Sequence, residues 1–226
     1  MRQKLLLFFT VCVFLAVMAL GIVKKQTYTD LTKQENYLAQ VQVAELPEKI
    51  AENACAVMSQ SLPNSAIILR VEVTGEIEHL FQVDRQKAVI QEICAGDELE
   101  KGEEIYIFSR HWQLDSDRNP GSIGRGFVNI MEVGTEYLVF AEAVSEDMET
   151  GDLLVELCDD FIIAPVFCYE ERQNVIVPTS GDTTYVAYAD VMDNEFFVTS
   201  EETLQMIETL KSRMLSLYPG DITISP

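Results

Sequence analysis

The segment 115–121, DSDRNPG, has the residue types and spacing that come closest to a metal site. Asp115, Asp117 and Asn119 alternate along it, and this spacing can direct three side-chain oxygens at one Ca²⁺. A hand-type calcium loop would instead have Gly where Pro120 stands and a bidentate Glu six residues later. Asp, Asn, Pro and Gly are also common in turns, so a solvated polar loop is the alternative. Calcium is the one cofactor for which the sequence offers a ligand set, and we favour the polar loop.

The histidines and cysteines are the remaining residues with catalytic chemistry. His79 and His111 are the only histidines, and they are too far apart in the sequence to have the spacing of metal ligands. A Cys nucleophile with a His base, using His111, would make an exported hydrolase or thiol enzyme. No local signature of such an enzyme surrounds any cysteine. We therefore expect a protein that is not an enzyme.

The segment 110–125 is the predicted binding face, because long loops carry function more often than tight turns do. It begins with Arg110, His111 and Trp112, and Trp and Arg are the residue types that dominate contact energies at interfaces. The sequence thus predicts that these three residues bind a protein or a glycan. In the alternative, Trp112 only anchors the loop, and the chain is a structural protein without a ligand.

Four cysteines follow the first 25 residues, and an even number in an exported domain permits two disulfides. Cys158 and Cys168 bracket the apolar stretch FIIAPVF and could face each other across strands. The sequence leaves two interpretations open, a bridge between Cys158 and Cys168 or small buried thiols, and we favour the buried thiols. Cys55 and Cys94 are the other two.

The segment 5–23 is an uncharged run of nineteen residues. As a helix it would span roughly 28 Å, close to the thickness of the hydrocarbon core of a bilayer. It is longer than the apolar region of a typical secretory signal, and it has only a poor cleavage site at its end. We predict that residues 1–25 are an uncleaved signal-anchor with a cytoplasmic N-terminus. The chain is then a single-pass protein of the cell membrane, with its body extracytoplasmic at the cell envelope.

The body is strongly acidic. Four of the 16 Lys and Arg lie in the first 25 residues, which hold no acid, so residues 26–226 carry 12 basic against 37 acidic side chains. Such a formal charge of −25 repels phosphate backbones, and nucleic-acid binding is excluded.

Three further segments are expected beyond the anchor. Residues 26–62 have apolar residues at helical spacing and predict a juxtamembrane helical stalk. Residues 63–190 alternate in strands, as in AIILRVEVT, where Leu69, Val71 and Val73 share one face. Residues 191–226 predict a C-terminal capping helix and tail, because Thr199-Ser200-Glu201-Glu202 resembles a capping box.

An ordered set of strands and turns in residues 50–145 resembles a known family. AIILRVEVTG precedes a long strand, the turn of VIQEICAGDE, the strand of EKGEEIYIF and finally VGTEYLVFAE. This order is similar to the oligonucleotide/oligosaccharide-binding-type (OB-type) barrel of netrin-module and tissue-metalloproteinase-inhibitor-like domains, including bacterial membrane-anchored relatives. The resemblance implies a mainly β fold, an OB-like closed or partly open antiparallel barrel with flanking helices. Those inhibitors act through an N-terminal Cys, which this chain lacks, so the resemblance implies a scaffold only.

Overall fold

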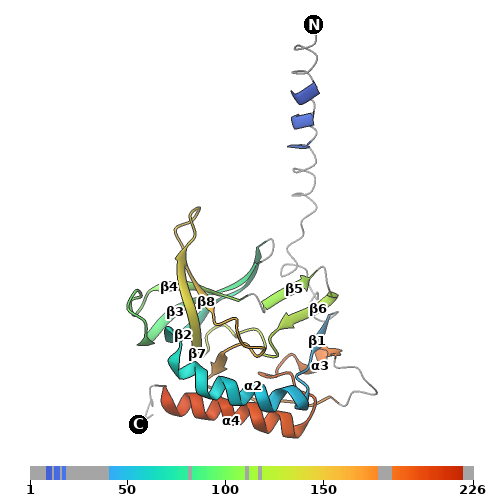
Figure 1. Ribbon diagram of the computed structural model, residues 1–226, viewed down its shortest axis with the longest axis vertical. Coiled ribbons are helices and arrows are strands. Elements are labelled where there is room, and N and C mark those ends of the chain that lie inside the picture. The colour runs from blue at the N-terminus through green and yellow to red at the C-terminus, as the bar shows by residue number, and fades with distance from the viewer. Residues whose placement is uncertain are drawn as a thin grey trace.

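The computed structural model describes residues 9–11, 13–15, 17–18, 41–80, 83–109, 112–116, 119–177 and 185–220. For 79–80, 83, 112–116, 119–121 and 123–125 it describes the backbone alone. The protein is mainly β (Figure 1). The strands are β1 (Gln42–Ala44), β2 (Ile67–Leu80), β3 (Val83–Ala95), β4 (Glu104–Phe108), β5 (Trp112–Ser116), β6 (Asn119–Arg125), β7 (Glu136–Glu146), β8 (Leu153–Leu157), β9 (Val166–Cys168) and β10 (Tyr185–Ala187). The helical elements are α2 (Glu48–Ser61), η3 (Leu62–Asn64), α3 (Tyr188–Val191) and α4 (Glu201–Leu217).

Five strands of the larger sheet are hydrogen-bonded in a ring. The order is β2-β3-β4-β8-β7, and β7 also pairs with β2, so both ends of the series meet. The β4–β8 pair is parallel and the other pairs are antiparallel. β9 is not part of the ring and extends the sheet by pairing with β7. Register shifts between β2 and β3, one of them between Val73 and Ile77, mark irregularities that let long strands bend.

The inside of the ring is an apolar core. Leu69, Val71 and Val73 are fully buried there, so the predicted shared face is confirmed. Side chains alternate across a strand, so every second residue of these strands points inward. Asp84 and Gln86 are buried polar residues in the same phase of β3, and the Gln86 amide exchanges two hydrogen bonds, of 2.8 and 3.0 Å, with the backbone of Met131.

Two helices cover one side of the ring. α2 and α4 pack over the outer faces of β2, β7 and β9, and they share a core with Ile68, Phe140 and Phe167 (Figure 1). The predicted C-terminal helix is confirmed, with Ser200 as the N-cap that accepts a hydrogen bond from Thr203 N at 3.2 Å. α2 is thus part of the packed body and not of a stalk.

Parts of the region 26–62 differ from the helical prediction. Residues 42–44 form β1, which pairs with β6 and β10 in a four-stranded second sheet of order β10-β1-β6-β5. Within α2 the buried residues include Ala51 and Cys55, whereas Ile50 and Val57 are exposed. Three-residue strands such as β1 are too short to show a period, and their partners are distant in the sequence. Residues 26–40 lie outside the described residues.

The N-terminal segment is described only in pieces. Residues 9–11, 13–15 and 17–18 are helical, and their large apolar side chains are exposed. Within the described residues, no helix is both long enough and apolar enough to cross a membrane. Most of the predicted anchor 5–23 lies outside those residues.

Candidate functional site

The outer side of β3, β4 and β8 is the part of the ring that α2 and α4 leave without a helical cover (Figure 1). We call it the β3–β4–β8 face. Two rows of paired residues cross it: Lys87 with Tyr106 and Leu154, and Arg85 with Phe108 and Glu156. Their neighbours Ala88, Ile105, Ile107 and Val155 point inward and are fully buried. The alternation of each strand therefore places cations and aromatic rings together on the outside.

Arg85 is the centre of this face. Its guanidinium carbon lies 3.8 Å from the centroid of the Tyr106 ring, a geometry in which the cation is attracted to the ring face. Its Nε lies 3.0 Å from Glu78 Oε2, and its Nη1 lies 3.7 Å from an oxygen of Asp152 and 3.9 Å from one of Asp147. One side chain thus joins the β2–β3 hairpin, the β7–β8 turn and β4.

The β7–β8 turn is built to hold its carboxylates in place. The Glu149 and Thr150 backbone amides donate to Asp147 Oδ1 at 2.8 and 3.3 Å. These amides, with Arg85 as a smaller contribution, lower the pKa of Asp147. Thr150 Oγ1 donates to Asp152 Oδ2 at 2.7 Å. Both side chains are therefore held in orientation, and Asp147 stays charged at neutral pH.

Lys87 and Glu104 form the second ion pair of the face. Lys87 Nζ lies 2.7 Å from Glu104 Oε1, and this hydrogen bond raises the pKa of Lys87. Glu104 side-chain exposure is 62%, so water and other molecules reach this pair freely. A pair this exposed contributes little stability and is free to exchange partners.

The face as a whole carries both charged and aromatic side chains. It combines two cations with four carboxylates around half-buried Tyr106 and Phe108. The rings supply apolar contact area, and the surplus of carboxylates at the rim favours a partner with basic groups. Among the described residues, no group of three or more His, Cys, Asp or Glu is placed to hold a metal ion.

The predicted binding residues lie next to this face along the chain. Arg110 and His111, two and three residues past the end of β4, are outside the described residues. Trp112 begins β5 and pairs with Arg125 of β6, so the segment expected to be a loop is a β-hairpin. The side chain of Trp112 is not among those described. The binding prediction for these three residues therefore stays a prediction.

The predicted calcium ligands fall in the same hairpin. Asp115 lies in β5 and Asn119 begins β6, both described as backbone only, and Asp117 lies outside the described residues. The calcium prediction therefore also stays a prediction.

The four described cysteines are free thiols. Cys158 packs in the core shared with α2 and α4, whereas Cys168 packs inside the ring. They lie in separate cores, so the Cys158–Cys168 bridge that the sequence left open is not formed in this structure, and both residues are buried thiols. Burial raises the pKa of every one of these thiols, that of Cys55 to about 11. Thiols of this kind are poor nucleophiles at neutral pH.

Sequence reasoning missed Arg85 and Tyr106 as site residues. The available signal was the alternation EIYIF, which puts Tyr106 and Phe108 in the opposite phase from buried Ile105 and Ile107. Nothing in the sequence marked Arg85, because Asp147 and Asp152 reach it from more than sixty residues away.

Comparison with known proteins adds no relative to this description. No protein-family model matches the chain, and no curated protein matches it significantly.

Proposed function

We propose that this chain is a non-enzymatic, membrane-anchored binding protein whose extracytoplasmic body contacts a protein of the cell envelope. The contact surface is the β3–β4–β8 face, with Tyr106 and Phe108 at its centre. The observation that carries the proposal is the arrangement of Arg85, which joins two turns and an aromatic ring on the side of the ring that α2 and α4 do not cover.

We further propose that the five-stranded ring is an OB-type barrel, akin to the netrin-module domains that the sequence resembles. The ring order β2-β3-β4-β8-β7 with closure onto β2 supports this assignment. OB-type barrels bind their ligands on the face of the second and third strands and with the adjoining loops. In this chain those strands are β3 and β4, and the loops include the β7–β8 turn that reaches Arg85.

The membrane anchor rests on the segment 5–23. Its described helical residues expose every large apolar side chain that they carry, from Val11 at 48% to Phe9 at 70%. Exposed apolar side chains on a helix favour insertion in lipid. The acidic body that follows is suited to a water-filled compartment and not to an anionic lipid surface.

The charge of the face favours a protein partner over a neutral glycan. Glu78 and Glu104 have side-chain exposures of 42% and 62%, so a partner with Lys or Arg side chains can pair with both. A neutral glycan would leave these carboxylates without compensation when it displaced their water. The aromatic rings would then contact apolar side chains of the partner.

The proposal is tested by crosslinking intact cells and isolating the full chain with its partner. Tyr106→Ala removes the central ring, and Glu104→Lys reverses the exposed charge, so both variants should lose the captured protein. Val57→Ala, a change at an exposed apolar residue of α2 on the helix-covered side, should keep it. Equal capture by all three variants would refute the assignment of the face. Capture of glycan and of no protein would favour the other ligand class.

A further inference from the structure

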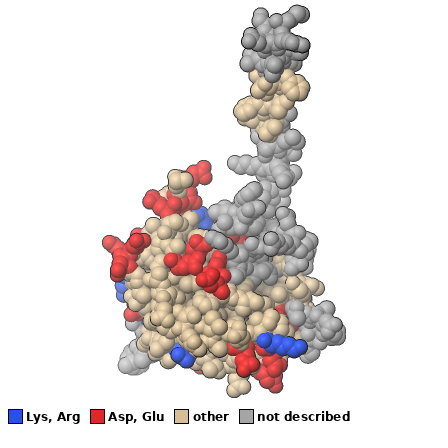
Figure 2. All heavy atoms as spheres, viewed as in Figure 1, with Lys and Arg blue, Asp and Glu red and all other residues tan. Residues whose placement is uncertain are grey.

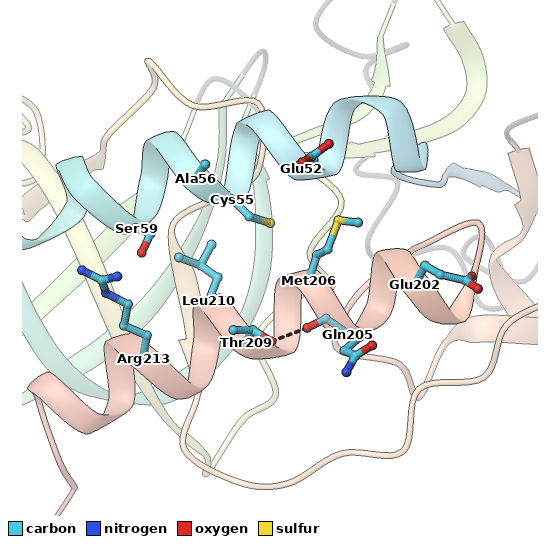
Figure 3. A pocket seen from close by; sticks show the side chains of 10 residues that line it. All are labelled: Glu52, Cys55, Ala56, Ser59, Glu202, Gln205, Met206, Thr209, Leu210 and Arg213. Carbon is cyan, nitrogen blue, oxygen red and sulfur yellow. Dashed lines mark hydrogen bonds between the residues drawn. The ribbon is translucent and has the colours of Figure 1, made fainter.

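A shallow groove of about 590 Å³ runs between α2 and α4 on the side away from the ring (Figure 3). The two helices run in the same direction, so their N-terminal ends lie together (Figures 1 and 3). Buried Cys55 and Leu210 and partly buried Met206 form the apolar part of its lining. We call it the α2–α4 groove.

The middle of the α2–α4 groove carries no charge. Ala56 and Ser59 line it from α2, and Thr209 lines it from α4. The Thr209 hydroxyl donates to the Gln205 carbonyl at 2.6 Å, so it is already satisfied within its own helix. Small, satisfied side chains let another backbone come close at little cost in desolvation.

Charges lie only at the two ends of the groove lining. Glu52 and Glu202 line the end nearer the helix N-termini, and Arg213 lines the opposite end (Figure 3). Figure 2, in the view of Figure 1, shows a broad surface without Asp, Glu, Lys or Arg over the central part of α2 and α4. On a chain with a formal charge of −21 this gap is unexpected. Depletion of charge at the centre with charge at the rim is the composition of protein interfaces.

We propose that the α2–α4 groove is the contact between two copies of this chain. A twofold axis through the centre of the groove places the acidic end of one copy over the Arg213 end of the other, twice. The same operation sets the helix pairs antiparallel, so that their macrodipoles attract. A twofold contact needs a patch that complements itself, and a neutral centre flanked by opposite charges at its two ends meets that need. A partner with basic groups alone would leave Arg213 opposed by like charge.

The test is the mass of the full chain in detergent micelles, measured by light scattering with the detergent contribution separated, over a range of protein concentrations. The parent should show twice the 25.5 kDa mass of one chain. Arg213→Glu should raise the dissociation constant of the dimer about tenfold or more, because both symmetry-related pairs are lost at once. Thr209→Arg, which puts a charge at the centre, should abolish the dimer.

The triple variant Glu52→Arg, Glu202→Arg and Arg213→Glu reverses the charge at both ends of the groove and should recover the dimer. Lys101→Glu, in the exposed turn before β4, makes the same charge change as Arg213→Glu outside the groove and should leave the dimer unchanged. Far-ultraviolet circular dichroism checks that each variant is folded. A monomeric parent, or a dimer that persists in both Arg213→Glu and Thr209→Arg, would overturn the proposal. So would a triple variant that dimerises no better than Arg213→Glu alone.

Discussion

Glu45 is a buried carboxylate whose ionisation should set part of the pH dependence of stability. It follows β1, its residue is only 2% exposed, and its Oε2 has no hydrogen-bond partner among the described residues. The adjacent Leu46 amide donates to the Phe197 carbonyl at 2.8 Å, which fixes the backbone there. Burial raises the pKa of Glu45 from 4.5 to about 7. The change that tests its role is Glu45→Gln, which keeps the shape and removes the ionisation.

The sign and size of the pH dependence that Glu45 gives to stability follow from the linkage between proton binding and folding. Between the ordinary pKa and the raised one, the folded protein holds a proton on Glu45 that the unfolded chain has released. The free energy of unfolding therefore falls as the pH rises from about 4.5 to about 7 and is flat above that. At about 1.4 kcal/mol per pKa unit, the loss is about 3 kcal/mol in all and about 2.5 kcal/mol between pH 5 and pH 8.

The assay is urea unfolding of the full chain in mild detergent, followed by circular dichroism at pH 5, 6.5 and 8. Other groups titrate in this range, so the measured quantity is the difference between the parent and Glu45→Gln. That difference should shift by about 2.5 kcal/mol in favour of the variant between pH 5 and pH 8. Glu48→Gln, at an exposed glutamate in the first turn of α2, is the matched control. A difference that stays constant with pH would refute the reasoning.

Three further substitutions test individual interactions that stabilise the fold. Arg85→Met leaves Glu78, Asp147 and Asp152 without their shared cation, and urea titration should show a loss of about 1–3 kcal/mol in unfolding free energy. An unchanged unfolding midpoint would mean that the ion pairs of Arg85 do not stabilise the fold. Lys211→Met leaves the buried carboxylate of Glu195, which is 4% exposed and lies 2.5 Å from Lys211 Nζ, without its cation. The free energy of unfolding should fall by about 3–5 kcal/mol at neutral pH. Because burial also raises the pKa of Glu195, that cost should shrink in acid, and titration at pH 5 and pH 8 checks it. Gly126→Ala should lower the unfolding free energy by about 2 kcal/mol or more, since φ is +55° and the new Cβ would lie 2.7 Å from Ala164 N; a stable variant in thermal melts would contradict this.

Local patterns were enough to predict individual elements. The alternation of Leu69, Val71 and Val73 correctly indicated an inward face, because a half-buried strand must sort its side chains by period two. The polar run Thr199-Ser200-Glu201-Glu202 correctly indicated the start of the C-terminal helix, because capping is local. The N-cap is Ser200, one residue later than the capping box with Glu202 at the third helical position implies.

Relations between distant segments could not be predicted in this way. The parallel β4–β8 pair and the three-residue strand β1 depend on contacts far along the chain. The same holds for the ion pairs of Arg85, whose carboxylates come from two separate turns. Proximity in sequence left a Cys158–Cys168 bridge open, and it is not formed because the chain between them turns from one core into the other.

Site-specific photocrosslinking in intact cells tests the central claim, that the β3–β4–β8 face contacts a protein partner. A photoreactive amino acid is placed at Tyr106 or Phe108 in the full chain, and at Val57 on the helix-covered side as a control. Positions 106 and 108 should each give one discrete adduct of the same mass, which Glu104→Lys abolishes, and position 57 should not give that adduct. Absence of an adduct at both face positions, or the same adduct from position 57, would contradict the account.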